Sequence, residues 1–171
     1  MDALETILTR RSTRRFSNEP ISDEMIHTLL DAAMSAPSAC NQQPWHFIVV
    51  KDRSLLDKIA SVHPCAKMCA QAPLSIVPCA DPDLQTKIGK DFWIQDLSAA
   101  TQNILLAARS LELGAVWCGV YPRKDNEKHI REIFQIPINI IPFAVIAIGY
   151  TDVQQIPVDR YKTDRVHTDI W

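Results

Sequence analysis

Glycine is scarce in this chain, and that scarcity excludes two common nucleotide sites. Four glycines occur in 171 residues, at positions 89, 114, 119 and 149. Neither a G-x-G-x-x-G fingerprint nor a G-x-x-x-x-G-K-[ST] loop is present, so a Rossmann dinucleotide site and a P-loop are excluded. A phosphate group would therefore have to be bound mainly by cationic side chains.

Long apolar runs are also missing. The longest candidate, Ile136–Gly149, contains Asn139 and two prolines and falls short of the roughly 20 apolar residues that span a bilayer. The N-terminus has an acid at position 2 and lacks the apolar segment of a secretory signal. We expect a cytoplasmic protein whose residues 1–171 form a single domain.

The cysteines do not form a convincing disulfide or metal pattern. Five are present, and an odd number without a signal peptide argues against a disulfide framework. His63, Cys65 and Cys69 have a C-x3-C spacing with no second knuckle, so we expect small packed residues and no metal site. A net charge of −2 gives no general reason to bind nucleic acid or an anionic membrane.

A polar loop leads into a strand at Ser35–Val50. Pro37 ends the preceding helix, and His46–Val50 is rich in the β-branched and aromatic residues of a buried strand. The loop offers uncharged donors and acceptors from Ser38, Asn41, Gln42 and Gln43. Such a loop suits a planar heterocycle better than a phosphate or a metal. The alternative is an ordinary helix–strand connection with an Asx turn at Asn41.

Four arginines and two hydroxyl residues lie within Arg10–Phe16, after a helix predicted at Asp2–Arg10. The planar guanidinium group matches two phosphate oxygens at once. In an extended segment Ser12 and Arg14 point to the same side. The segment is a candidate anion site, and a solvated basic patch is the alternative.

A long helix and a glycine-bearing strand follow. Asp91–Leu113 is apolar on more than one side, which predicts a core helix or a subunit interface, with Gly114 as its C′ glycine. Ala115–Tyr121 is a predicted strand in which Gly119 indicates a bulge or the close approach of a ligand. Within it we expect Trp117 and Cys118 to be packing residues, with a flavin wall and a reactive thiol as the alternatives.

The remaining elements complete an α+β chain of four or five strands flanked by helices. The tail Thr151–Trp171 is polar, so it is either disordered or an ordered arm across another subunit. The other expected elements are a helix from Ser22 or Asp23 to Ser35, a helix at Leu55–Val62 with Ser54 as its N-cap, a strand at Leu74–Ala80, a helix at Asn126–Phe134 and a strand at Phe143–Tyr150.

Taken together, four motifs in this order resemble the nitroreductase family of small FMN-dependent NAD(P)H oxidoreductases. They are RRSTRRF at Arg10–Phe16, APSACNQQPWHF at Ala36–Phe47, LGAVWCG at Leu113–Gly119, and the tail containing Pro157, Arg160-Tyr161 and Arg165-Val166-His167. The resemblance covers essentially the whole chain. It implies a central, mostly antiparallel sheet flanked by helices, and a domain-swapped homodimer with FMN at the interface. Residues 151–171 would embrace the partner subunit.

The resemblance also implies cofactor-binding residues and no catalytic side chain, since the flavin carries the chemistry. For the phosphate and ribityl end they are Arg10, Ser12, Arg14 and Arg160, with Arg11 adjacent. For the flavin ring, the resemblance implies Pro37, Ser38 and Ala39 of the other subunit, and Asn41 and Gln43, which bond the ring or fix the loop. Lys67 would lie on the pyrimidine side of the ring. The backbone of Trp117, Cys118 and Gly119 would face N5.

The implied function is a ping-pong transfer of hydride from NADH or NADPH, through flavin N5, to an electron-poor acceptor such as a nitroaromatic or a quinone. The alternatives are a non-catalytic flavin-binding module, a flavin-dependent dehalogenase or flavin-cleaving relative, and a thiol–metal protein. The chain departs from the family pattern in its short length. It also has Cys118 where some members carry an acidic residue beside N5.

Overall fold

The structure is a computed structural model that describes residues 2–171. The α-helices are α1 (Ala3–Thr9), α2 (Asp23–Met34), α3 (Arg53–Val62), α4 (Trp93–Ser110) and α5 (Lys124–Phe134). The strands are β1 (Trp45–Val50), β2 (Leu74–Ala80), β3 (Gly114–Gly119), β4 (Ile141–Pro142) and β5 (Ala144–Gly149). Short 3-10 turns are η1 (Ala39–Asn41), η2 (Lys67–Ala70), η3 (Pro82–Leu84) and η4 (Thr163–Arg165). The predicted α+β class is confirmed.

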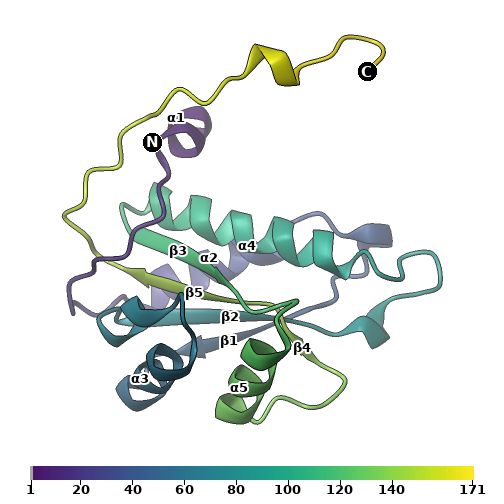
Figure 1. Cartoon of the computed structure of the whole chain (residues 1–171). Coiled ribbons are helices and arrows are strands. Elements are labelled where there is room, and N and C mark those ends of the chain that lie inside the picture. The colour runs from purple at the N-terminus through teal and green to yellow at the C-terminus, as the bar shows by residue number, and fades with distance from the viewer. Residues whose placement is uncertain (1) are drawn as a thin grey trace.

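The strands form one antiparallel sheet in the order β1-β2-β5-β3, with β4 paired to β2. Trp45 at the start of β1 pairs with Ala80 at the end of β2, whereas Gly114 at the start of β3 pairs with Gly149 at the end of β5. Because β5 and β2 are also antiparallel, the starts of β1 and β3 lie at opposite ends of the sheet. They also lie on its two opposite edges (Figure 1).

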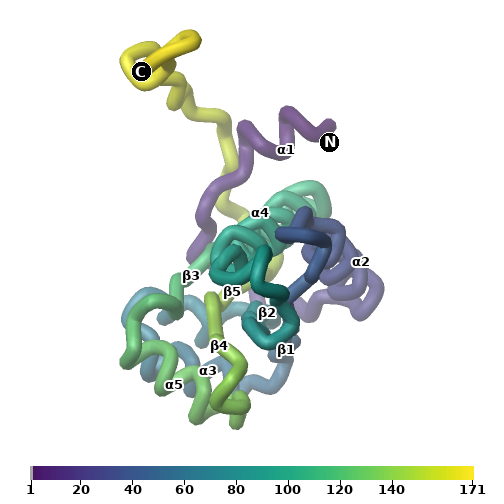
Figure 2. The backbone as a smooth tube through the Cα atoms, turned by 90° about the vertical axis from the view of Figure 1, so that its right-hand side faces the viewer, coloured from purple at the N-terminus to yellow at the C-terminus, as the bar shows by residue number. Residues whose placement is uncertain are grey.

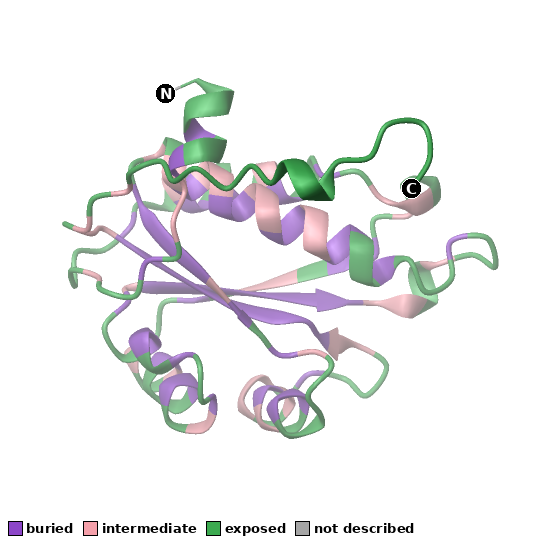
Figure 3. Cartoon of the chain, turned by 45° about the horizontal axis from the view of Figure 1, so that its top comes forward, coloured by how far each residue is buried: buried purple, intermediate pink, exposed green. Residues whose placement is uncertain are grey.

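A hydrophobic core lies on each face of the sheet. Helices α2 and α4 cover one face, and α3 and α5 cover the other (Figures 1 and 3). Every residue of β2 and β5 is buried, as expected for strands covered on both faces. In α4, Leu97, Ala100 and Ile104 are fully buried, which confirms the core helix, one of the two roles that the sequence predicted for this segment.

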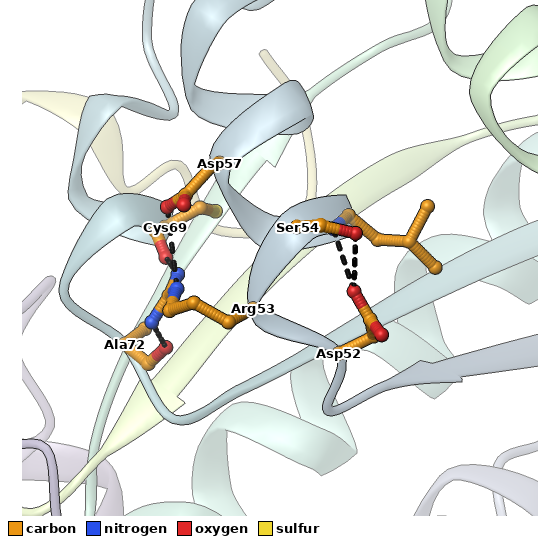
Figure 4. A network of polar contacts seen from close by, with 7 residues as sticks. Asp52, Arg53, Ser54, Asp57, Cys69 and Ala72 are labelled. Atoms are coloured by element: carbon orange, nitrogen blue, oxygen red, sulfur yellow. Dashed lines mark hydrogen bonds and ion pairs between the residues drawn. The ribbon is translucent and has the colours of Figure 1, made fainter.

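Two predicted helix boundaries are wrong in detail. The N-cap of α3 is Asp52, whose carboxylate accepts from Leu55 N at 3.1 Å, while the hydroxyl of Ser54 donates to the same carboxylate at 2.6 Å (Figure 4). The ionised carboxylate is the stronger acceptor for the free amides of the first turn. Helix α4 ends through Glu112, which takes a left-handed φ of 60°, and Gly114 lies in β3 instead.

Arg53 ties η2 to α3. Its guanidinium donates to the backbone carbonyls of Cys69 and Ala72, the latter at 3.0 Å, and pairs with Asp57 at 3.2 Å (Figure 4). The carbonyl contacts satisfy polar groups at the end of a short turn that has no regular ladder of its own. This fixes the segment that passes beside the end of β3.

Both termini project from the same side of the body (Figures 1 and 2). The tail is exposed almost throughout (Figure 3), and Trp171 is 100% exposed. The chain has 9,997 Å² of accessible surface, whereas a compact monomer of this mass has about 8,500 Å². Apolar residues of α1 are also exposed, among them Leu4, Ile7 and Leu8. None of the helices in residues 2–171 is long and apolar enough to cross a membrane.

Candidate functional site

The arginine-rich segment lies against the start of β3. Thr13 N donates to Ala115 O at 3.0 Å, and Ser12 and Ala115 form a parallel bridge. Thr13 is buried, so the alternation of an extended chain leaves Ser12 and Arg14 exposed on the other side. The structure therefore gives Ser12 and Arg14 the common direction that the sequence predicted.

Arg160, from the tail, lies close to Arg10 and Arg11 at the start of this segment. Partial burial lowers the pKa of Arg10, and the positive charges of Arg160 and Arg11 lower it further. Arginine nevertheless stays protonated. Within residues 2–171, Arg10, Arg11, Arg14 and Arg160 form no ion pair with a carboxylate. Like charges held together without counterions make a strongly positive site that suits an anion.

Arg11 has a different setting from the other arginines. Its guanidinium donates to the carbonyl of Arg10 at 3.0 Å and to that of Ile156, and its backbone amide donates to Gln155 Oε1 at 3.1 Å. These contacts hold the start of the tail against the arginine-rich segment. They explain how Arg160 is brought close to Arg10.

The outer edge of β3 is open beyond Ala115. In an antiparallel strand alternate residues point both backbone polar groups to the same side. Ala115 O bonds Thr13 on the outer side, so the backbone groups of Trp117 and Gly119 also point outward, away from β5. The edge thus presents hydrogen-bonding groups on a line that starts at the arginine-rich segment. A planar heterocycle with polar edges matches such a row.

Gly119 leaves free space on this edge. A Cβ atom placed on Gly119 would approach only Tyr121 O, at 3.9 Å. The packing of the chain itself therefore does not require glycine here, and the space is available to a ligand. The neighbouring Trp117 is half-buried, with its ring 5.6 Å from that of Phe143, so it is largely a packing residue.

Cys118 is a protonated thiol at neutral pH. Burial raises its pKa to about 11, although Arg14 lies close enough to oppose that rise. Its thiol donates to the carbonyl of Cys65 at 3.0 Å. Because the thiolate is the reactive form of cysteine, Cys118 serves packing and does not act as a nucleophile.

Lys67 is exposed on η2, and its ammonium lies 3.5 Å from Ser61 O. Cys65, two residues before Lys67, is joined to β3 by its contact with Cys118. Lys67 therefore lies near the open edge of β3. Its side chain is long, flexible and exposed, so its ammonium group is not held in one place.

The polar loop is held by its own side chains. Ser38 Oγ accepts from Gln43 N at 3.0 Å, and Gln43 Nε2 donates to Asn41 Oδ1 at 3.0 Å. Cys40, Asn41 and Gln43 all have positive φ, which costs free energy for residues other than glycine. The side chains of Asn41 and Gln43 thus fix the loop, one of the two roles that the sequence left open.

Within one chain, the loop and the arginine-rich segment do not meet. The loop containing Pro37, Ser38 and Ala39 precedes β1, and the arginines lie at the start of β3, at the opposite end and edge of the sheet. The two predicted halves of the site are therefore separated by the width of the sheet within one chain.

Two buried polar residues near the site were not predicted. Asp96 on α4 accepts from Ala39 N at 2.9 Å, and His63 lies 3.0 Å from Gly119 O. A lone acid on the apolar side of a helix was a detectable signal for Asp96. His63 carried no comparable signal, and both of its ring nitrogens have hydrogen-bonding partners, so neither is free to bind a metal.

Comparison with known proteins agrees with this geometry. The model of the Nitroreductase family matches residues 7–63 and 60–150. A protein of Methanothermobacter thermautotrophicus, whose name places it among NADH dehydrogenases and NAD(P)H nitroreductases, is 49% identical over 171 residues, covering 100% of this chain and 88% of its own.

Two solved structures are also similar. An FMN-dependent nitroreductase from Clostridium difficile has a TM-score of 0.90 at 29% identity, covering 98% of this chain and 99% of its own. A Desulfovibrio desulfuricans structure described as a complex with FMN has a TM-score of 0.83 at 29% identity, covering 100% and 98%. This chain belongs to the nitroreductase family.

Proposed function

We propose that this protein is an FMN-dependent oxidoreductase that transfers hydride from NADH or NADPH to an electron-poor acceptor such as a nitroaromatic or a quinone. The observation that carries the proposal is the cluster of arginines without carboxylate partners beside the open edge of β3. A dianionic phosphate fits the cluster, and a polar-edged ring fits the edge. The FMN named for the two similar structures supports the same cofactor.

In this proposal Arg10, Ser12, Arg14 and Arg160 hold the phosphate. Charge-assisted hydrogen bonds from guanidinium groups to phosphate oxygens are among the strongest in proteins. The outward backbone groups of Trp117 and Gly119 face the ring, while those of Cys118 between them point toward β5. Lys67 and Arg14 place positive charge near it, which stabilises negative charge there.

When bound, FMN supplies the redox chemistry by accepting hydride at N5 and passing it to the acceptor. The chain contributes orientation and electrostatics. No acid, base or nucleophile is required of a side chain, and the buried, protonated Cys118 thiol is consistent with that.

We also propose that the active form is a homodimer, with residues 151–171 lying across the partner. Three observations support it: the exposed apolar residues of α1 and the tail, the excess surface of the single chain, and the separation of the loop from the arginines. In the dimer, Pro37, Ser38 and Ala39 of one copy complete the ring site of the other. A cytoplasmic location remains a prediction from the sequence.

The test is a visible absorption spectrum of the purified protein before and after anaerobic addition of NADH or NADPH. A flavin spectrum that bleaches, and returns when a quinone is added, is the expected result. A flavin spectrum that persists with both donors would favour a binding module without turnover. No flavin after reconstitution with FMN would contradict the proposal.

A further inference from the structure

One short turn holds two consecutive residues of β3. His63 Nε2 lies 3.0 Å from Gly119 O, and the Cys118 thiol donates to Cys65 O at 3.0 Å. The turn His63–Cys65 follows α3, far from β3 in sequence. It thus fixes the end of β3 from outside the sheet, where no neighbouring strand can do so.

The protonation state of His63 follows from its partners. Cys65 N donates to Nδ1 at 3.2 Å, so Nδ1 carries no proton, and the proton is on Nε2, which donates to Gly119 O. His63 is 1% exposed, and burial lowers its pKa, so the ring is neutral. Asn126 adds a second, longer donor contact to Gly119 O at 3.5 Å.

Gly119 needs such an anchor for two reasons. Glycine has more backbone freedom than any other residue, and the outward groups of Gly119 have no strand beside them. Its carbonyl belongs to the peptide group between Gly119 and Val120, whose amide donates to Phe143 O at 3.0 Å, so the contact with His63 holds that group from its other side. Holding this group limits the torsions of Gly119, which also set the direction of the Gly119 amide. That amide lies on the open edge.

We infer that His63 is a positioning residue whose Nε2–H holds the Gly119 carbonyl and thereby aims the backbone edge of β3 at the flavin ring. The inference rests on the proposed function, in which FMN lies along this edge. A histidine that only fills the core would affect stability but not the affinity or the redox potential of the flavin.

The decisive variants are His63→Gln and His63→Asn. Glutamine places an amide donor near the Nε2 position, while asparagine carries the same amide one methylene shorter and does not reach Gly119 O. We expect His63→Gln to bind FMN within about threefold of the unmodified protein and His63→Asn to bind about tenfold more weakly, because one hydrogen bond to an aligned group is lost. The flavin midpoint potential should shift in His63→Asn only. His27→Asn, on the exposed face of α2, is the control.

A second measurement uses the unmodified protein without FMN. Nitrogen-15 NMR of the His63 ring should show a neutral imidazole with its proton on Nε2, and a proton on Nδ1 would overturn the inference even if a variant failed to fold. Amide exchange at Gly119 and Val120 should be faster in His63→Asn than in His63→Gln. If the unmodified protein binds no FMN, the proposed function fails. If it binds FMN and His63→Asn matches it in affinity and potential, only the positioning role fails.

Discussion

The carboxylate of Asp96 accepts a hydrogen bond from the backbone amide of Ala39 at 2.9 Å, although 56 residues separate them. Asp96 is 4% exposed and lies near the start of α4, where the helix dipole favours a negative charge. Its second oxygen is 3.4 Å from Gln85 Nε2. The strained loop before β1 is thus fastened to the central helix by a buried acid.

Replacing Asp96 should loosen that loop. Asp96→Leu leaves the Ala39 amide without its acceptor and should lower the free energy of unfolding by about 1–3 kcal/mol. Asp96→Asn keeps an acceptor oxygen and should cost less. Urea denaturation measures both, and Asp31→Asn on the exposed side of α2 should stay within about 0.5 kcal/mol of the unmodified protein. Equal losses for the leucine and asparagine variants would show that the hydrogen bond is not the cause.

The arginine site predicts a contrast between adjacent residues. Arg14→Ala should weaken FMN binding by about 10- to 100-fold, because a phosphate loses a charge-assisted partner worth about 1.5–3 kcal/mol. Arg15→Ala removes the same charge from the opposite side of the extended segment and should change affinity less than threefold. Fluorescence titration with FMN measures both variants. Equal weakening of FMN binding in both variants would indicate that the arginines act through their overall positive charge and that Arg14 does not contact the phosphate.

Much of this fold could be predicted from local sequence pattern. The apolar run of Phe143–Tyr150 predicted a strand buried on both faces, and β5 is one. The alternation that puts Ser12 and Arg14 on one side of an extended segment is local too. The sheet order was not predictable in this way, because it depends on contacts between residues far apart in the chain.

The residues whose roles the sequence did not predict also depend on contacts between distant parts of the chain. Asp96 and His63 have functions set by partners 57 and 56 positions away, which no local pattern contains. Gly114 looked like a helix-ending glycine, yet Glu112 takes the left-handed position and Gly114 is needed for a close approach. A Cβ at Gly114 would come within 2.9 Å of Thr13 Cγ2 and 2.8 Å of Thr151 Cγ2.

The left-handed backbone of Glu112 and the close packing of Gly114 give two linked predictions. Glu112→Gly should raise the free energy of unfolding by about 0.5–1 kcal/mol, because glycine adopts a φ of 60° without a steric penalty. Gly114→Ala should lower it by about 1–3 kcal/mol, because the added methyl collides with two threonines. Thermal and urea unfolding give both values. A stabilising Gly114→Ala would contradict the close approach.

The tail should matter to assembly and cofactor retention together. Deleting residues 152–171 removes Arg160 and the exposed apolar residues of the arm, such as Ile156 and Trp171. We expect a loss of dimer in light scattering and a loss of FMN during gel filtration. Ile138→Ser, which removes an exposed apolar residue outside the arm, is the control. A truncated protein that stays dimeric and flavin-loaded would refute the arm.

Burial of a neutral His63 predicts a specific loss of stability in acid. Its pKa in the folded protein is lowered, while in the unfolded chain it is about 6.5. As the pH falls below about 6.5, the unfolded state binds a proton that the folded state does not, so stability falls until the lower folded pKa is reached. One such proton changes the free energy of unfolding by at most about 1.4 kcal/mol per pH unit.

The comparison that isolates His63 is the change in unfolding free energy between pH 7.5 and pH 5.5 in the unmodified protein and in His63→Gln. The other four histidines are common to both proteins, so the difference reports residue 63 alone. We expect the glutamine variant to lose less stability over this interval, whatever its stability at pH 7.5. Equal losses would mean that His63 is protonated as easily in the folded protein as in the unfolded chain. A charged ring at that position would then donate from both nitrogens, and the contact with Cys65 N could not persist.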